Sequence, residues 1–96
     1  MARRDRLSDG AILKALSRLD GWTREGDAIT RAFEFGDFSE AFGFLARVAL
    51  LQEQADHHAE VHAVYNRVRL TLSTHDAGGV TQVDIDLAAK IDALLP

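Results

Sequence analysis

Residues 41–51 are the part of the sequence that most restricts how this chain can fold. Only Gly43 and Arg47 among them are not apolar, and Asp37 or Ser39 can cap a helix that runs on to residue 56. A helix that is apolar nearly all round must be covered on more than one side. One sheet covers one side, so we expect the other side to contact another chain; the alternative is a helix enclosed within the monomer. The two apolar stripes are Phe42, Leu45 and Ala49, and Phe44, Val48 and Leu51.

The N-terminal part of the chain predicts a helix followed by a β-hairpin. Ser8 or Asp9 can cap a helix that stops near Gly21, and its apolar residues recur at helical spacing. Those apolar residues are Ile12, Leu13, Leu16 and Leu19. Residues 25–27, Glu-Gly-Asp, favour a turn, and the alternation from 29 to 35 has the period of a strand.

The β-branched stretch 61–74 is either one long strand or two strands joined at residues 65–67, Tyr-Asn-Arg. Asn66 favours the second arrangement, because asparagine tolerates a positive φ angle. A single straight strand would separate His58 from His75 by up to about 55 Å. A hairpin would return both histidines to the same end of the sheet. A shared histidine site therefore requires the hairpin.

The C-terminal part predicts a last helix after the turn at Gly78-Gly79. Thr81 can cap it, and the carboxylate of Asp84 can complete a capping box. Its buried stripe is Ile85, Ala88, Ile91 and Leu95. The order α-β-β-α-β-β-α predicts an α+β fold, a four-stranded antiparallel sheet with three helices packed on one face. We expect residues 1–96 to form a single domain, with residues 1–7 as a flexible terminus.

Charge and composition exclude several classes of function. With 11 basic and 15 acidic residues the formal charge is −4, which argues against a dedicated nucleic-acid-binding protein. No apolar run approaches the roughly 18 residues of a membrane span. The absence of cysteine excludes disulfides and thiolate chemistry and is compatible with the cytoplasm, where we expect the protein to reside.

The four histidines are all found between residues 57 and 75, and they allow two kinds of site. His58 and His62 stand four residues apart, as the zinc ligands of a helix do, with Glu60 between them. That segment looks like a strand, however, and no cysteine is available as a further ligand. We therefore expect no metal.

Proton transfer is the interpretation that fits His57, His58 and His75 better. Imidazole gives and takes protons near neutral pH, and the two adjacent histidines can converge at a corner between a helix and a strand. Glu53 and Asp56 lie just upstream, where a carboxylate can fix a tautomer or raise basicity. The alternative for each single histidine is a polar surface residue, or a cation at the C-terminal end of a helix.

Residues 56–84, DHHAEVHAVYNRVRLTLSTHDAGGVTQVD, resemble the signature of the pterin-4a-carbinolamine dehydratases. The shared pattern is a His-His pair, Val-Tyr-Asn, a Leu-x-Thr-His segment and an Asp about nine residues further on. The resemblance extends from residue 10 to residue 94. It departs from the pattern at Ala59, where the family usually has proline, and at Val61 and His62, where aromatic residues are common.

The resemblance implies a reaction as well as a fold. Family members are α+β chains that assemble as dimers or tetramers, which here would use the second helix and the sheet edges. They act as 4a-hydroxytetrahydrobiopterin dehydratases, eliminating water from a 4a-hydroxytetrahydropterin to give quinonoid dihydropterin. This recycles the tetrahydropterin used by aromatic amino acid hydroxylases. No metal or organic cofactor is implied, and the small pterin is the expected partner.

By position, the resemblance assigns catalytic roles to three histidines. His58 and His75 would be the acid and base that act on the hydroxyl group and the ring nitrogen, and His57 would orient the pterin. Further substrate-binding residues carried over or placed beside them are Glu53, Asp56, Ala59, Thr74, Asp76, Ala77, Asp84 and Trp22. His62 is expected to be a strand or surface residue, and Trp22 fits core packing equally well.

A second class of function remains open at this point. Some animal relatives bind the dimerisation helix of a transcription factor and act as coactivators. The apolar second helix would be the docking face for such a partner. Self-association through the same helix explains its composition more simply.

Overall fold

The computed structural model describes residues 4–96 and has the element order predicted from the sequence. One short 3₁₀ helix, η1, is added before the last helix. The elements are α1 (Asp9–Leu16), β1 (Thr23–Glu25), β2 (Ala28–Glu34), α2 (Phe38–Ala55), β3 (Glu60–Val64), β4 (Arg67–Leu72), η1 (His75–Ala77) and α3 (Gln82–Asp92).

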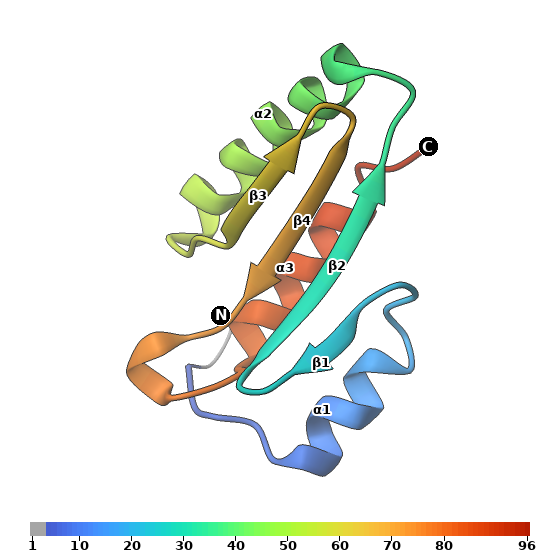
Figure 1. Ribbon diagram of the computed structural model, residues 1–96. Helices are drawn as coiled ribbons and strands as arrows, with labels where there is room; N and C mark the ends of the chain where they lie inside the picture. The colour runs from blue at the N-terminus through green and yellow to red at the C-terminus, as the bar shows by residue number, and fades with distance from the viewer. Residues whose placement is uncertain (1–3) are drawn as a thin grey trace.

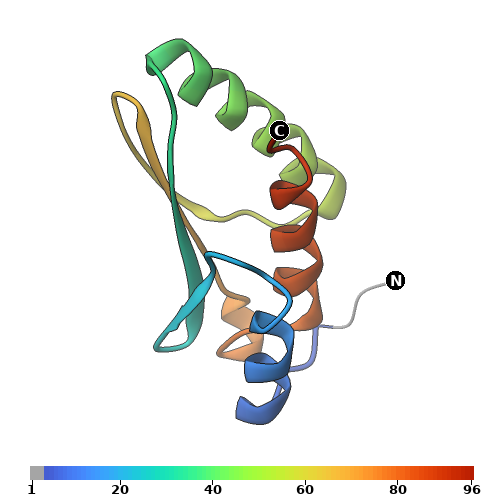
Figure 2. The ribbon, with the colours of Figure 1, turned by 90° about the vertical axis from the view of Figure 1, so that its right-hand side faces the viewer.

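The four strands form one antiparallel sheet in the order β1-β2-β4-β3. The helices lie on one face of this sheet, and the other face is open (Figures 1 and 2). The α+β class predicted from the sequence is therefore confirmed. No helix among residues 4–96 has the length and apolar character needed to cross a membrane.

Strand β4 shows how the sheet separates its two faces. Val68, Leu70 and Leu72 point to the helices and are at most 1% exposed. Arg67 and Arg69 alternate with them and are exposed on the open face. Successive side chains of a strand point to opposite sides, so a single strand contributes both to the core and to an accessible surface.

The stretch 61–74 is a hairpin, which settles the alternative left open by the sequence. Its positive φ angle falls on Tyr65, at 52°, and not on Asn66. Asn66 instead bonds to the end of β2. Its side-chain amide donates to the carbonyl of Phe35, and its own carbonyl accepts from the Phe35 amide, both at 2.8 Å. These bonds hold the asparagine in place and leave the left-handed position to the tyrosine.

Helix α2 is covered on one side only. Asp37, not Ser39, is its N-cap, with Oδ1 accepting from the Glu40 amide at 2.8 Å. Phe44 and Val48 are buried against the sheet and α3. The opposite side is exposed among the described residues, with Phe42 at 60% and Leu50 at 66%. The monomer therefore does not enclose this helix.

Helix α1 is shorter than the sequence predicted. It ends at Leu16 instead of Gly21, and the Ser17 hydroxyl donates to the Lys14 carbonyl at 2.6 Å, a bond that competes with continued helix. Leu13 is exposed, although it fitted the apolar spacing. Arg24 of β1 reaches Asp9 of this helix at 2.8 Å, and the guanidinium holds the pKa of that carboxyl below its ordinary value.

Two residues of the terminus that we predicted to be flexible bond to the segment around the start of α3. Leu7 donates its amide to the carbonyl of Val80 at 2.8 Å, and Arg6 forms a β-bridge with Thr81. These contacts lay the N-terminal segment beside the start of α3. Residues 1–3 of the predicted terminus lie outside the described part of the chain.

Candidate active site

The histidine pair lies at the end of α2, where the chain reverses direction. Asp56 terminates the helix in the left-handed conformation, with φ 50° and ψ 46°. This residue gives His57 and His58 different surroundings: the first is buried and 8% exposed, and the second is exposed. The guanidinium of Arg4 donates to the Asp56 carbonyl at 3.2 Å and so holds the reversal from outside.

A buried carboxylate anchors His57. Its Nε2 lies 2.5 Å from Oδ1 of Asp84, a residue with no exposed surface. The other carboxylate oxygen accepts from the amide of Thr81 and the hydroxyl of Thr74, each at 2.9 Å. Asp84 thus completes the capping box of α3, as the sequence predicted, and fixes the His57 ring with the same side chain.

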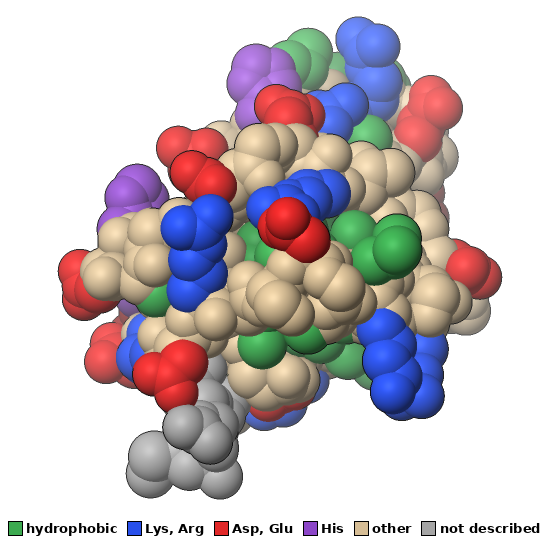
Figure 3. All heavy atoms as spheres, turned by 90° about the horizontal axis from the view of Figure 1, so that it is seen from below, with side chains coloured by type: hydrophobic (Ala, Val, Ile, Leu, Met, Phe, Trp, Pro, Cys, Tyr) green, Lys and Arg blue, Asp and Glu red, His purple; other side chains and the backbone are tan. Residues whose placement is uncertain are grey.

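His75 reaches the pair through the β3–β4 hairpin. It begins η1, directly after Thr74, and its side chain is exposed. A pocket of about 280 Å³ is lined by all three histidines, and a neighbouring one of about 130 Å³ is lined by His58 and His75. The structure therefore brings together the three histidines that the sequence placed in one site. Seen from below, the visible histidine side chains lie along one side of the molecule (Figure 3).

Of the other residues singled out in the sequence, some contact the histidines or line their pockets and others do not. Glu53 lies at the site, where its Oε1 is 3.1 Å from Nε2 of His58. Asp56, Thr74 and Asp76 line the larger pocket. Ala77 ends η1 and lines neither pocket.

Trp22 is placed away from the histidines, in the core. Its indole N–H donates to both oxygens of Asp92, at 2.9 and 3.1 Å, near the far end of α3. Its ring packs edge-on against Phe33, with the centroids 6.2 Å apart. Of the two alternatives weighed for Trp22, the structure supports core packing.

His62 also lies apart from the three histidines, on the open face of the sheet. It belongs to β3, pairs across the strands with Arg69, and lines a different pocket. Within residues 4–96 no group of three or more His, Asp or Glu side chains is arranged to hold a metal ion.

Three residues at the site carried no recognisable signal in the sequence. Arg4 belongs to the terminus that the sequence predicted to be flexible, and Ser73 is an ordinary polar residue just after β4 that lines both pockets. Gln52 is 7% exposed, and its Oε1 accepts from the Ala59 amide at 2.6 Å. Glutamine on a helix is usually exposed, so nothing in the local pattern indicates that this one supports the corner.

The comparison with protein families decides what kind of chain this is. The family model described as "Pterin 4 alpha carbinolamine dehydratase" matches residues 5–94. The chain belongs to the pterin-4α-carbinolamine dehydratase family.

Relatives within this dehydratase family are similar over nearly their whole length. A protein of Bradyrhizobium sp., provisionally named a pterin-4-alpha-carbinolamine dehydratase, is 54% identical over 94% of this chain and 93% of its own. A Brucella ovis protein with the same provisional name is 50% identical over 95% of this chain and 96% of its own. The resemblance drawn from the sequence is thus confirmed at the level of the family.

Two solved structures share the fold of this chain. A crystal structure from Brucella melitensis, described as a transcriptional coactivator/pterin dehydratase, superposes with a TM-score of 0.93 at 48% identity and covers 96% of this chain and all of its own. A pterin dehydratase-like protein, described as a RuBisCO assembly factor in the alpha-carboxysome, has a TM-score of 0.63 at 24% identity over 76% of this chain and 84% of its own. The second likeness concerns the fold alone.

Membership in the dehydratase family gives meaning to the departure at Ala59. At a position where the resemblance led us to expect proline, this chain has a residue with a backbone N–H, which donates to Oε1 of Gln52. A proline fixes its own φ angle but has no donor. The hydrogen bond to the Gln52 side chain, which comes from α2, therefore holds this corner.

Proposed function

We propose that this protein is a 4a-hydroxytetrahydropterin dehydratase, a hydro-lyase that needs no organic cofactor. The observation that carries the proposal is the position of His58 and His75, which line the same two pockets from separate segments of the chain. Family membership supports a dehydratase. The substrate and the roles of the individual residues are part of the same proposal, and the geometry supports them.

The reaction needs one proton donor and one proton acceptor. The C4a–O bond breaks, the hydroxyl takes a proton and leaves as water, the neighbouring ring nitrogen loses its proton, and the electron pair forms a C4a=N bond. His58 and His75 suit these two roles because both are exposed to the pockets and imidazole exchanges protons near neutral pH. Glu53 contacts His58 Nε2 and can set which ring nitrogen carries the proton.

His57 suits binding better than proton exchange. Its Nε2 is already engaged by Asp84, so its orientation is fixed before any substrate arrives. A fixed imidazole edge in the pocket wall can hydrogen-bond the polar edge of a pterin. Pre-organised polar groups of this kind orient a substrate without an ordering cost at the moment of reaction.

The test of the proposal is the rate of 4a-hydroxytetrahydropterin dehydration in the presence of the protein. The substrate also dehydrates without catalyst, so each rate is read against a protein-free blank. We expect clear acceleration, since acid–base groups in such positions contribute on the order of 10²–10⁴-fold. A rate equal to the blank at micromolar protein would refute the dehydratase proposal. The expected physiological setting is tetrahydropterin recycling for aromatic amino acid hydroxylation in the cytoplasm.

We also propose that the protein self-associates as a homodimer or homotetramer, with α2 in the contact. The exposed apolar side chains on this helix are Phe38 at 55%, Phe42 at 60% and Leu50 at 66%. Phe38 and Phe42 stack on each other, with their centroids 5.7 Å apart, and form a ready apolar surface. Strand β3 is an exposed sheet edge that can add to the contact.

Light scattering tests this association directly. Wild type is expected to elute as an oligomer and Phe42→Glu as a smaller species, because a buried charge opposes an apolar interface. Arg47→Glu is a control on the same helix. A monomeric wild type would contradict self-association and would favour the alternative function, a coactivator-type module that docks a partner through the same face.

A further inference from the structure

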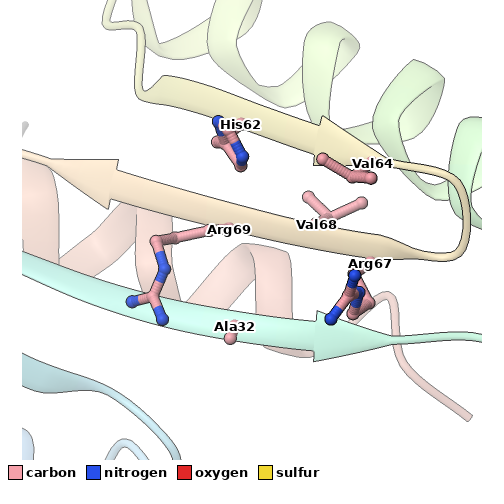
Figure 4. A pocket seen from close by; sticks show the side chains of 6 residues that line it. All are labelled: Ala32, His62, Val64, Arg67, Val68 and Arg69. Carbon is pink, nitrogen blue, oxygen red and sulfur yellow. The ribbon is translucent and has the colours of Figure 1, made fainter.

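The open face of the sheet carries a cationic hollow that the dehydration chemistry does not use. It has a volume of about 280 Å³ and is lined by Ala32, His62, Val64, Arg67, Val68 and Arg69 (Figure 4). Two of these side chains are guanidinium groups and one is an imidazole. No carboxylate is among the lining residues.

This hollow lies on the same face as the histidine pocket, further along the same two strands. The cross-strand pairs are Glu60 with Thr71, His62 with Arg69, and Val64 with Arg67. Glu60 and Thr71 also line the smaller histidine pocket, together with His58, Ser73 and His75. The pair His62–Arg69 is therefore the next outward-facing pair after the wall of the candidate active site. Outward pairs follow one another at about 7 Å along a strand.

Between the histidines and the cations the face is polar. Ser73 and Thr71 offer hydroxyl groups, and Glu60 offers a carboxylate. Hydroxyl groups of a ligand can hydrogen-bond all three, whereas an anion beside Glu60 would be repelled. The pattern suits a chain that is hydroxylated near the ring and negatively charged only at its far end.

The two arginines differ in how firmly they are held. Arg69 donates from Nη1 to the Thr30 hydroxyl at 3.3 Å, and its side chain reaches from β4 toward β2 (Figure 4). Arg67 faces Glu34 across the strands, yet no ion pair within 4 Å joins Arg67 to any described residue. Both guanidinium groups keep donors free for a planar, bidentate anion such as phosphate or carboxylate.

We infer that this hollow is the subsite for a terminal anion on the side chain of the pterin substrate. The inference rests on the proposed function and narrows it: the preferred substrate would have a hydroxylated side chain that ends in a phosphate or a carboxylate. His62 and Arg69 would bind the anion, and Arg67 would add charge at the outer end.

Isothermal titration calorimetry with stable dihydropterins tests the inference. The probes are dihydroneopterin, whose side chain ends in a hydroxyl group, its terminal phosphate ester, and a dihydropterin with a terminal carboxylate. We expect wild type to bind at least one of the anionic probes about tenfold more tightly than dihydroneopterin, the size expected for one charge-assisted hydrogen bond. The anionic probe with the larger gain in affinity, the phosphate or the carboxylate, identifies which of the two groups the subsite binds.

Variants separate this subsite from the catalytic pocket. Arg69→Gln is expected to bring the anionic probe to the affinity of dihydroneopterin and to leave dihydroneopterin binding unchanged. Arg47→Gln, on α2 behind the sheet, makes the same change of charge and should retain the preference. Circular dichroism verifies folding.

The outcomes distinguish failure of the subsite from failure of the proposed function. If dihydroneopterin binds and neither anionic probe binds more tightly than it does, the subsite proposal is overturned and the dehydratase proposal is left intact. A gain that persists in Arg69→Gln would also overturn it. So would a gain that Arg69→Gln and Arg47→Gln reduce equally, since general charge attraction would then be the cause. If no pterin binds to wild type, the proposed function fails and the subsite with it.

Discussion

Replacing either His58 or His75 with alanine is expected to lower kcat for pterin dehydration by about 100-fold or more, to near the uncatalysed rate. Each change removes one partner of the proposed donor–acceptor pair, and acid–base groups contribute on the order of 10²–10⁴-fold. Both side chains are exposed, so the folded structure should survive either change. The measurement is a stopped assay against a protein-free blank, with the thermal midpoint recorded for each variant.

The matched control for these two variants is His62→Ala. It removes an exposed imidazole from the same molecule, but one that lines a separate hollow. Turnover of a substrate without a charged side chain should be unchanged. If both His58→Ala and His75→Ala keep most of the wild-type rate, proton transfer by these histidines is wrong. The fixed His57 would then have to be reconsidered as the main catalytic group.

Changing Asp84 to alanine is expected to have the largest effect on stability of any change at the site. The carboxylate is fully buried and holds His57, Thr74 and Thr81. Its removal leaves several buried polar groups without partners and takes the cap from α3, which together should lower the free energy of unfolding by about 3 kcal/mol. In a domain of this size the thermal midpoint should fall by more than about 10 °C.

Asp84→Asn separates the structural role of this residue from its role at the site. The amide keeps the shape and one acceptor oxygen, so the capping bond to the Thr81 amide can persist while the ring of His57 loses its carboxylate. We expect a smaller loss of stability and a rise in KM that exceeds the fall in kcat, because His57 is proposed to orient the pterin.

Asp92→Asn is the control for this effect. Asp92 is a partly buried carboxylate on the same helix, where it accepts from Trp22 and Arg31. It is about 12 Å further along α3. This variant should lose stability with KM unchanged. An Asp84→Asn protein with wild-type KM would contradict the orienting role of the pair.

Local patterns were sufficient to predict most of the fold. The two-residue period of β2, the β-branched composition of the stretch that holds β3 and β4, the helical period of α2 and the capping box at Thr81 each correspond to an element in the structure. One error concerns a position where a tertiary contact overrides a local preference. Asn66 would favour a positive φ by itself, but its bonds to Phe35 take it out of that position.

The histidines of the site could be predicted because imidazole side chains are rare in this chain. The residues that support them could not be predicted from the sequence. Three of the four histidines converge, which the hairpin makes possible. Gln52 and Arg4 act on the backbone of the corner, through Ala59 and Asp56, and such contacts depend on distances that only the folded chain defines. Trp22 is the opposite case. It stood out in the sequence as a candidate site residue, but in the structure it packs in the core.

The alternation along β4 also bears on how this protein could change over evolutionary time. Val68, Leu70 and Leu72 hold the interior together, while the side chains between them face solvent on the way out of the histidine pocket. Selection on ligand preference can thus act at the odd-numbered positions of this strand, and selection on thermal tolerance at the even-numbered ones, with little conflict between the two. A family built on such a strand can acquire new ligands without first gaining a reserve of stability.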